Sequence, residues 1–233
     1  MKLYHFLPLM LTLALGGTSC HKSSETQYVV TVNVVNAMAT ANPIAPFFGE
    51  GPAHYANYPA IGYQSAGLFS PLSGTVPVSV VPMTDTTFHI FSGNLTFQPN
   101  GIYSFFLAGD TTKPDTVLTF DKIPLYNDSS SGVRFINLSP GSQALSVTLA
   151  GNPASQTEFS GLTYKKISGF NKYLADSSIP GDYMFVIRDE ATGDSLTSFD
   201  WSYALQKNHT LVIAGSTDPA SPTPLSVFQM QNY

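Results

Sequence analysis

The amino-acid sequence predicts an all-β protein built from two tandem antiparallel β-sandwiches. Its composition is the first reason: 43% of the residues are hydrophobic, only 11% are charged, and 17 Pro and 18 Gly are spread along the chain. Strands rich in β-branched and aromatic residues, separated by turn residues, have this composition. No segment places apolar residues at a convincing helical spacing, and one apolar pattern occurs twice along the chain. Together these features favour two similar all-β domains.

The first 19 residues have the layout of a secretory signal. Lys2 supplies a positive charge, Phe6–Leu15 form an apolar stretch, and 16–19 are small residues that a peptidase can accept. The apolar stretch is shorter than the about 20 residues that a transmembrane helix needs. We therefore expect residues 1–19 to be a cleaved signal peptide and not a membrane anchor.

Cys20 is the only cysteine in the chain, and it directly follows this signal. In a bacterial lipoprotein a cysteine at this place receives diacylglycerol through its thiol, and Leu15–Cys20 resembles such a lipobox. Thr18 and Ser19 depart from the commonest Ala-Gly pair, a looser form that is similar to the signals of Bacteroidetes lipoproteins. The alternative is a chance cysteine after an ordinary signal. We predict that lipid on Cys20 anchors the protein to the outer membrane, on the periplasmic or the exposed side, with residues 20–26 as a polar tether.

An internal repeat divides the rest of the chain. An offset of 101 residues lays Val32–Asn36 on Val133–Asn137, and the apolar positions that follow agree in order for nearly 40 residues. After about five extra residues in the second copy, Phe105–Gly109 falls on Leu211–Gly215. Chance agreement in a strand-rich chain is the alternative. Duplication predicts one domain over 27–126 and a second over 127–233, with a Ser/Gly-rich linker over 121–132.

Each copy is expected to form about seven short strands, as an immunoglobulin-like or transthyretin-like sandwich does. In the first copy the predicted strands are Tyr28–Asn36, a weaker run near Phe47, Ile61–Phe69, Val76–Val81, Thr87–Phe91, Ile102–Leu107 and Val117–Phe120. In the second copy they are Val133–Asn137, Leu145–Leu149, Leu162–Phe170, Tyr183–Arg188, Leu196–Trp201, Thr210–Ala214 and Leu225–Met230.

The second copy resembles a known family. The segments that carry the resemblance are Val133–Pro140, Leu145–Leu149, Leu162–Tyr164, Ile179–Tyr183 and Leu211–Gly215. They are similar to the domain of unknown function 4397, a family of extracytoplasmic bacterial β-sandwich domains that often occur in tandem and on lipoproteins. The first copy departs from the family pattern where Asn36–Ala39 replaces its Asn-x-Ser-Pro turn. The resemblance implies a fold and a compartment, and it implies no activity or catalytic residues.

Several classes of function find no support in the sequence. A net charge of −5 with scattered Lys and Arg argues against nucleic acid as a partner. His54, His89 and His209 lack the spacing of metal ligands, so no metal is expected. Residues 62–67 have one residue too many for a nucleophile elbow. We therefore expect neither an enzyme nor a cofactor.

The densest acidic cluster, Arg188–Asp194, has two interpretations. Its carboxylates could hold calcium, but the order of residues differs from a calcium-binding loop. Asp and Gly are also the usual residues of a turn between strands, and a hairpin turn is the favoured interpretation.

An aromatic loop over 46–59 is the best candidate for ligand binding. Phe47 and Tyr55 could stack on sugar rings, while Glu50, His54 and Asn57 could supply hydrogen bonds. Packing within the core or between domains is the favoured alternative for this loop.

The leading hypothesis is a non-enzymatic, lipid-anchored cell-envelope protein with a structural or extracellular binding role. A glycan-binding accessory lipoprotein is one alternative. A fimbrial or adhesin-like subunit that pairs strands with a neighbour is another.

Overall fold

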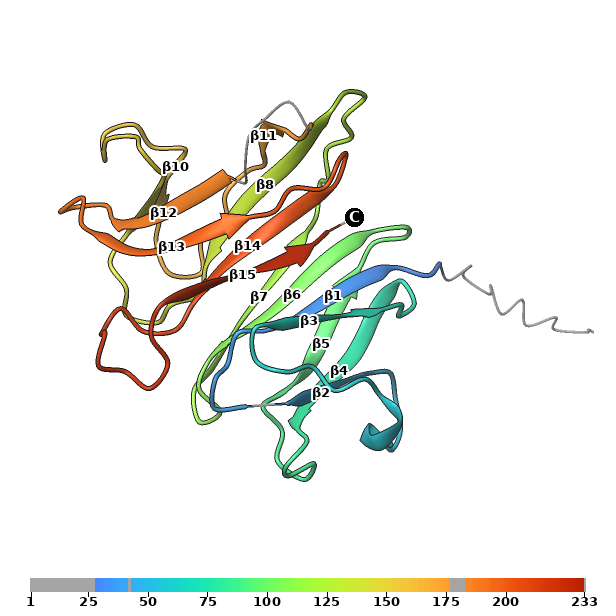
Figure 1. Cartoon of the computed structure of the whole chain (residues 1–233). Coiled ribbons are helices and arrows are strands. Elements are labelled where there is room, and N and C mark those ends of the chain that lie inside the picture. The colour runs from blue at the N-terminus through green and yellow to red at the C-terminus, as the bar shows by residue number, and fades with distance from the viewer. Residues whose placement is uncertain (1–27, 42, 177–182, 233) are drawn as a thin grey trace, which may run out of the picture.

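The computed structural model describes residues 28–41, 43–176 and 183–232. The predicted signal peptide, Cys20 and the tether lie outside these residues. Within them the predicted all-β fold class is confirmed: fifteen strands form four sheets, arranged as two sandwiches (Figure 1).

The first sandwich contains seven strands and one short 3-10 helix. The strands are β1 (Thr31–Asn36), β2 (Ile44–Phe48), β3 (Ser65–Phe69), β4 (Gly74–Pro82), β5 (Phe91–Phe97), β6 (Ile102–Gly109) and β7 (Pro114–Phe120), and the helix η1 is Tyr55–Asn57. They form one sheet in the order β3-β1-β6-β7 and a second in the order β2-β4-β5.

The second sandwich contains eight strands. They are β8 (Ser130–Asn137), β9 (Leu145–Leu149), β10 (Phe159–Leu162), β11 (Asn171–Leu174), β12 (Tyr183–Asp189), β13 (Ser195–Trp201), β14 (Asn208–Ala214) and β15 (Ser226–Gln231). Their sheets have the orders β11-β8-β14-β15 and β10-β9-β12-β13, so the strand order of the first sandwich recurs with one added edge strand.

The central sheet of each sandwich contains one parallel pair. β1 pairs with β6 and β8 pairs with β14 in parallel, whereas every other strand pair is antiparallel among the described residues. A purely antiparallel sandwich was expected, so this pairing corrects the prediction. Parallel strands occur almost only where both faces of a sheet are covered. Each residue of β8 and of β14 is buried, as this condition requires.

Several predicted strands have other bounds in the structure, and two of them differ most. The strand expected over Thr87–Phe91 begins where it was expected to end, because the Asp85 carboxylate accepts hydrogen bonds from the backbone and hydroxyl of Thr87 and forms a turn. The strand expected over Leu162–Phe170 is instead the connection between β10, which ends at Leu162, and β11, which begins at Asn171. Lys165 in that connection has a positive φ of 66°, which a continuous strand does not allow.

Each sandwich has its own core between its two sheets. The first core gathers Phe97, Phe105 and Tyr103, with Phe97 and Tyr103 in an edge contact of 5.0 Å between ring centroids. The second core centres on the fully buried Trp201, whose ring lies 6.1 Å from that of Phe185. Aromatic side chains thus pack in edge or tilted contacts within both cores, beside the aliphatic residues of the strands.

A third core joins the two sandwiches. The sheets β3-β1-β6-β7 and β11-β8-β14-β15 turn their outer faces toward each other, so that the four sheets lie in succession (Figure 1). The apolar side chains of this core are Val35, Ala37, Phe106 and Ala108 from the first sandwich and Ile136, Leu138, Val212, Ala214, Phe228 and Met230 from the second. Because burying one large apolar side chain contributes about 1.5–3 kcal/mol, separating the sandwiches is unfavourable.

The interface between the sandwiches has approximate two-fold symmetry. Lys165 Nζ of the second sandwich lies 2.6 Å from Asp115 Oδ1 of the first, and this hydrogen bond holds the pKa of Asp115 below its usual value. Gln64 Nε2 of the first sandwich donates to Ser226 Oγ of the second at 2.5 Å. The strand registers make Gln64 equivalent to Lys165 and Asp115 equivalent to Ser226. The same two positions therefore contact each other at two places in the interface. At one place the first sandwich supplies the first position, and at the other place the second sandwich supplies it, as in the interface of a symmetric dimer.

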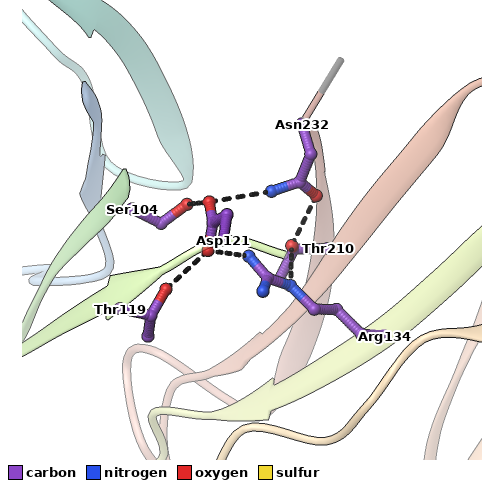
Figure 2. Close-up of polar contacts among 6 residues, drawn as sticks. All are labelled: Ser104, Thr119, Asp121, Arg134, Thr210 and Asn232. Atoms are coloured by element: carbon purple, nitrogen blue, oxygen red, sulfur yellow. Dashed lines mark hydrogen bonds and ion pairs between the residues drawn. The ribbon is translucent and has the colours of Figure 1, made fainter. Parts of the chain in front are cut away.

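A buried polar network lies in the same interface (Figure 2). Asp121, directly after β7, accepts hydrogen bonds from Arg134 of β8 at 2.7 Å and from Ser104 of β6 at 2.6 Å. The side chains of Arg134 and Asp121 are 6% and 0% exposed. Asn232 connects to this network through Thr210 and Asp121. The predicted linker over 121–132 therefore begins with a buried residue, and its last three residues belong to β8.

Candidate functional site

An aromatic groove lies on the outer face of the sheet β2-β4-β5. Residues of β2 alternate between the core and this face, and Phe47 is the half-buried residue that points outward. The chain after β2 returns over the face through η1 and brings Tyr55 and Tyr58 to Phe47, with ring centroids 6.4 and 5.5 Å away. Both contacts are edge-to-face, so part of the Phe47 ring stays exposed. Phe47 and Tyr55 form the aromatic wall of the groove, and Tyr58 packs against Phe47 without lining the groove itself.

Polar groups form the base of the groove beside this wall. Ser79 lies opposite Phe47 in the register of β2 and β4. Its Oγ is 2.8 Å from the Tyr55 hydroxyl oxygen and 2.7 Å from His89 Nδ1. Asn94 of β5 also lines the cavity, which has a volume of about 430 Å³. An aromatic wall next to hydroxyl, imidazole and amide groups can stack on a ring and hydrogen-bond to its substituents.

The structure brings together only two of the five residues predicted for this site. Phe47 and Tyr55 line the groove. Glu50 is exposed and lines a different cavity, on the far side of Gly49. His54 and Asn57 are exposed at the two ends of the short helical turn, where the Asn57 backbone N–H donates to the His54 carbonyl at 2.9 Å.

Sequence reasoning missed the other members of the groove and the contact of Tyr58 with Phe47. Ser79 lies at an outward position of a predicted strand, so alternation alone could have indicated it. Asn94 was missed because β5 was placed too early in the chain. His89 was considered only for metal binding, and Tyr58 reaches Phe47 through a turn whose path the sequence does not specify.

The acidic cluster forms a turn, as favoured. Asp189 Oδ1 accepts hydrogen bonds from the backbone N–H groups of Ala191 and Thr192, and Arg188 Nη1 donates to the Gly193 carbonyl. These contacts close the hairpin between β12 and β13. Within the described ranges, no group of three or more His, Cys, Asp or Glu is placed to hold a metal ion.

Nor do the described residues include a helix of the length and apolarity needed to cross a membrane.

Comparison with known proteins assigns no family. No family profile and no curated protein matches the chain. Among solved structures, a family 26 carbohydrate-binding module of Eubacterium rectale Amy13K in complex with maltoheptaose has a TM-score of 0.27 and 11% identity, covering 87% of this chain and 97% of its own.

Two Bacteroides ovatus proteins are further matches. A candidate adhesin has a TM-score of 0.24 and 10% identity over 89% of this chain and 97% of its own. A DUF3823 family protein has a TM-score of 0.18 and 8% identity over 75% and 96%. These similarities are too low to support an argument about the function of this chain, so the function rests on its own residues.

Proposed function

We propose that this protein is a non-enzymatic, lipid-anchored protein of the bacterial cell envelope with a structural or extracellular binding role. The third core carries the proposal, because it joins the sandwiches into one unit and leaves the aromatic groove on the sheet β2-β4-β5 outside this contact. In this proposal Cys20 carries the lipid, residues 20–26 are the tether, and the domains extend over 27–126 and 127–233. The resemblance to the domain of unknown function 4397 supports the same compartment.

Membrane fractionation tests the anchor. Cys20→Ala removes the thiol that would receive the lipid, so the variant should leave the membrane fraction, because two or three acyl chains supply nearly all of the membrane affinity. Ser23→Ala, a substitution in the same tether, is the matched control and should stay with the membrane. Membrane association of Cys20→Ala equal to that of the control would refute the anchor.

A second candidate function is recognition of a glycan by the aromatic groove. The observation that favours it is the partly exposed Phe47 ring beside the hydrogen-bonded series Tyr55–Ser79–His89. Aromatic faces pack on the C–H faces of sugars, and the polar series matches hydroxyl groups. No Asp, Glu, Lys or Arg among the described residues lines the groove, so we expect a neutral glycan.

A glycan array with the detergent-solubilised full chain tests this second function. Phe47→Ala and Tyr55→Ala should each reduce binding by about tenfold or more, since each removes a stacking surface or a hydrogen bond. Leu125→Ala, at an 85% exposed position outside the groove, is the control. Binding that is equal in all four proteins would exclude the groove as the glycan site.

A further inference from the structure

A second cavity lies in the interface between the sandwiches, where β3 of the first lies next to β15 of the second. We call it the seam cleft, and its volume is about 820 Å³. Its lining includes five amide side chains, Asn33, Gln64, Gln229, Gln231 and Asn232. Each amide carries an NH₂ group that donates hydrogen bonds next to an oxygen that accepts them.

One of these amides is buried without a partner. Asn33 is 6% exposed, and its Nδ2 makes no hydrogen bond to any atom of the described residues. Buried polar groups are almost always hydrogen-bonded, because an unpaired one keeps the full penalty of losing water. The Asn33 amide therefore points to a hydrogen-bond acceptor that is not part of the chain.

The two-fold symmetry of the interface explains why the cleft exists. Asn33 of β1 pairs with Ser104 of β6 in the first sandwich. Arg134 of β8 pairs with Thr210 of β14 at the same place in the second sandwich, so Asn33 and Arg134 are equivalent residues. In one half of the interface the long Arg134 side chain crosses to Asp121 (Figure 2).

In the other half the corresponding residues are both asparagines. The backbone N–H of Asp121 donates to the Ile102 carbonyl, and that of Asn232 donates to the Asn208 carbonyl at the matching place, so Asn232 is equivalent to Asp121. Asn33 and Asn232 both line the seam cleft. In this half of the interface, the cleft thus occupies the position that the Arg134–Asp121 ion pair occupies in the opposite half.

The apolar contact of the ion pair also has a counterpart in the cleft. The Phe170 ring packs against the Arg134 guanidinium, 4.7 Å from its carbon to the ring centroid. Leu68 is paired with Asn33 in the β1–β3 register and lines the cleft with 65% of its surface exposed. Leu68 therefore offers an apolar surface that no described part of the chain covers.

We propose that the seam cleft binds a neutral, hydroxyl-rich saccharide, with the Asn33 amide hydrogen-bonding to a ring hydroxyl and Leu68 packing on a C–H face. Amide side chains match pairs of neighbouring hydroxyls, which also donate and accept. Among the residues that the structure describes, Lys207 is the only charged one that lines the cleft, and none of the lining residues carries a carboxylate. This arrangement excludes a cationic ligand such as a second guanidinium. The proposal extends the binding role proposed above and uses none of the residues of the aromatic groove.

Titration of the detergent-solubilised full chain with neutral oligosaccharides, followed by saturation-transfer NMR and calorimetry, tests the proposal. Asn33→Leu and Leu68→Asp should each weaken binding by about tenfold or more, because they remove a donor and the apolar surface. Leu125→Asp makes the same change as Leu68→Asp at an exposed position outside the cleft and should bind as wild type. Phe47→Ala should also bind the cleft ligand as wild type.

The outcomes separate the seam cleft from the other proposals. Gln231→Ala, at an exposed position of the cleft wall, provides a third variant if Asn33→Leu unfolds at a lower temperature. Absence of saccharide binding to the wild-type chain would overturn the proposal. So would binding by every cleft variant that is as strong as binding by the wild type. Binding lost in Phe47→Ala and kept in Leu68→Asp would assign the sugar to the aromatic groove and overturn the cleft. None of these results bears on the anchor, which Cys20→Ala tests separately.

Discussion

Arg134 of the second sandwich and Asp121 of the first form an ion pair across the interface, with Nη2 and Oδ1 2.7 Å apart. Both side chains are almost fully buried, so each charge has lost its water and depends on the other. The ion pair also lies on one half only of a two-fold interface, and it is the clearest difference between the two halves.

Breaking this ion pair should destabilise the protein strongly. Arg134→Met should lower the free energy of unfolding by about 3–5 kcal/mol, because it leaves the Asp121 carboxylate buried without its cation. The double variant Arg134→Met/Asp121→Asn removes both charges and should recover part of this loss. Guanidinium unfolding followed by tryptophan fluorescence measures both.

The exposed ion pair of Lys172 with Asp128 is the matched control. Its atoms are 2.6 Å apart, close to the 2.7 Å of the buried pair, but both side chains are about half exposed. Lys172→Met should therefore change the free energy of unfolding by about 1 kcal/mol or less. Equal effects of Lys172→Met and Arg134→Met would show that burial does not strengthen the interface pair.

A repeated asparagine closes the first turn of each sandwich. The Asn36 side chain bonds to the Ile61 carbonyl and to the backbone N–H of Met38. Asn137 makes the same two kinds of contact, with the Leu162 carbonyl and the backbone N–H of Ser139. The departure of residues 36–39 from the family pattern thus leaves the role of the first asparagine unchanged.

Substitution of either asparagine should have a similar cost. Asn36→Ala and Asn137→Ala should each lower the free energy of unfolding by about 1–3 kcal/mol, because buried backbone groups lose their hydrogen-bond partners. Asn57→Ala, at an exposed position, should stay within about 0.5 kcal/mol of wild type. Thermal and chemical unfolding measure all three, and an Asn36→Ala as stable as Asn57→Ala would contradict the structural role.

Stability should fall in mild acid because of His209. Burial in the second core, and then the charge of Lys207, lower the pKa of His209 from 6.5 to about 4. Its Nδ1 accepts a hydrogen bond from Trp201 Nε1 at 3.3 Å, so a proton on Nδ1 would break this contact. Because the unfolded chain binds the proton more readily than the folded chain, neutral His209 contributes to the free energy of unfolding. This contribution is complete above about pH 6.5 and is lost as the pH falls toward 4, by at most about 3 kcal/mol.

Unfolding free energies measured between pH 7.5 and 4 test this pH dependence. His209→Gln should flatten the curve over this window, although it lowers stability at neutral pH. His54→Gln, at an exposed position, controls for the loss of an imidazole and should keep the wild-type slope. The same slope in His209→Gln as in wild type would refute the assignment.

Gly215 should be essential for the end of β14. Its φ is +91°, and an added Cβ would meet the Pro224 carbonyl group. Gly151 has a similar φ of +85° with no atom within 4 Å of an added Cβ. Gly151→Ala should cost about 1–3 kcal/mol from the backbone conformation alone, and Gly215→Ala should cost more. Equal losses in urea unfolding would show that the predicted clash relaxes.

Much of the local structure could be predicted because alternation is a short-range signal. β9 has the predicted bounds, Leu145–Leu149, since Leu and Val alternate there with Ser and Thr and a Gly-Asn-Pro turn follows. β5 was misplaced because Asp85 and Thr87 form a turn through side-chain bonds that an apolar pattern does not contain. Of the aromatic groove, Phe47 and Tyr55 could be named from their residue types, whereas the pairing of Ser79 with Phe47 required the sheet register.

The all-β class, the alternation of most strands and the internal repeat could be predicted, because each depends on residue types at a regular spacing. That the outer faces of two sheets cover each other, and that Arg134 meets Asp121 while its equivalent Asn33 faces a cleft, became clear from the folded structure. A strand's pattern specifies which side chains share a face, but residues far away in the chain decide what covers that face, as Gln64 and Ser226 show across the interface.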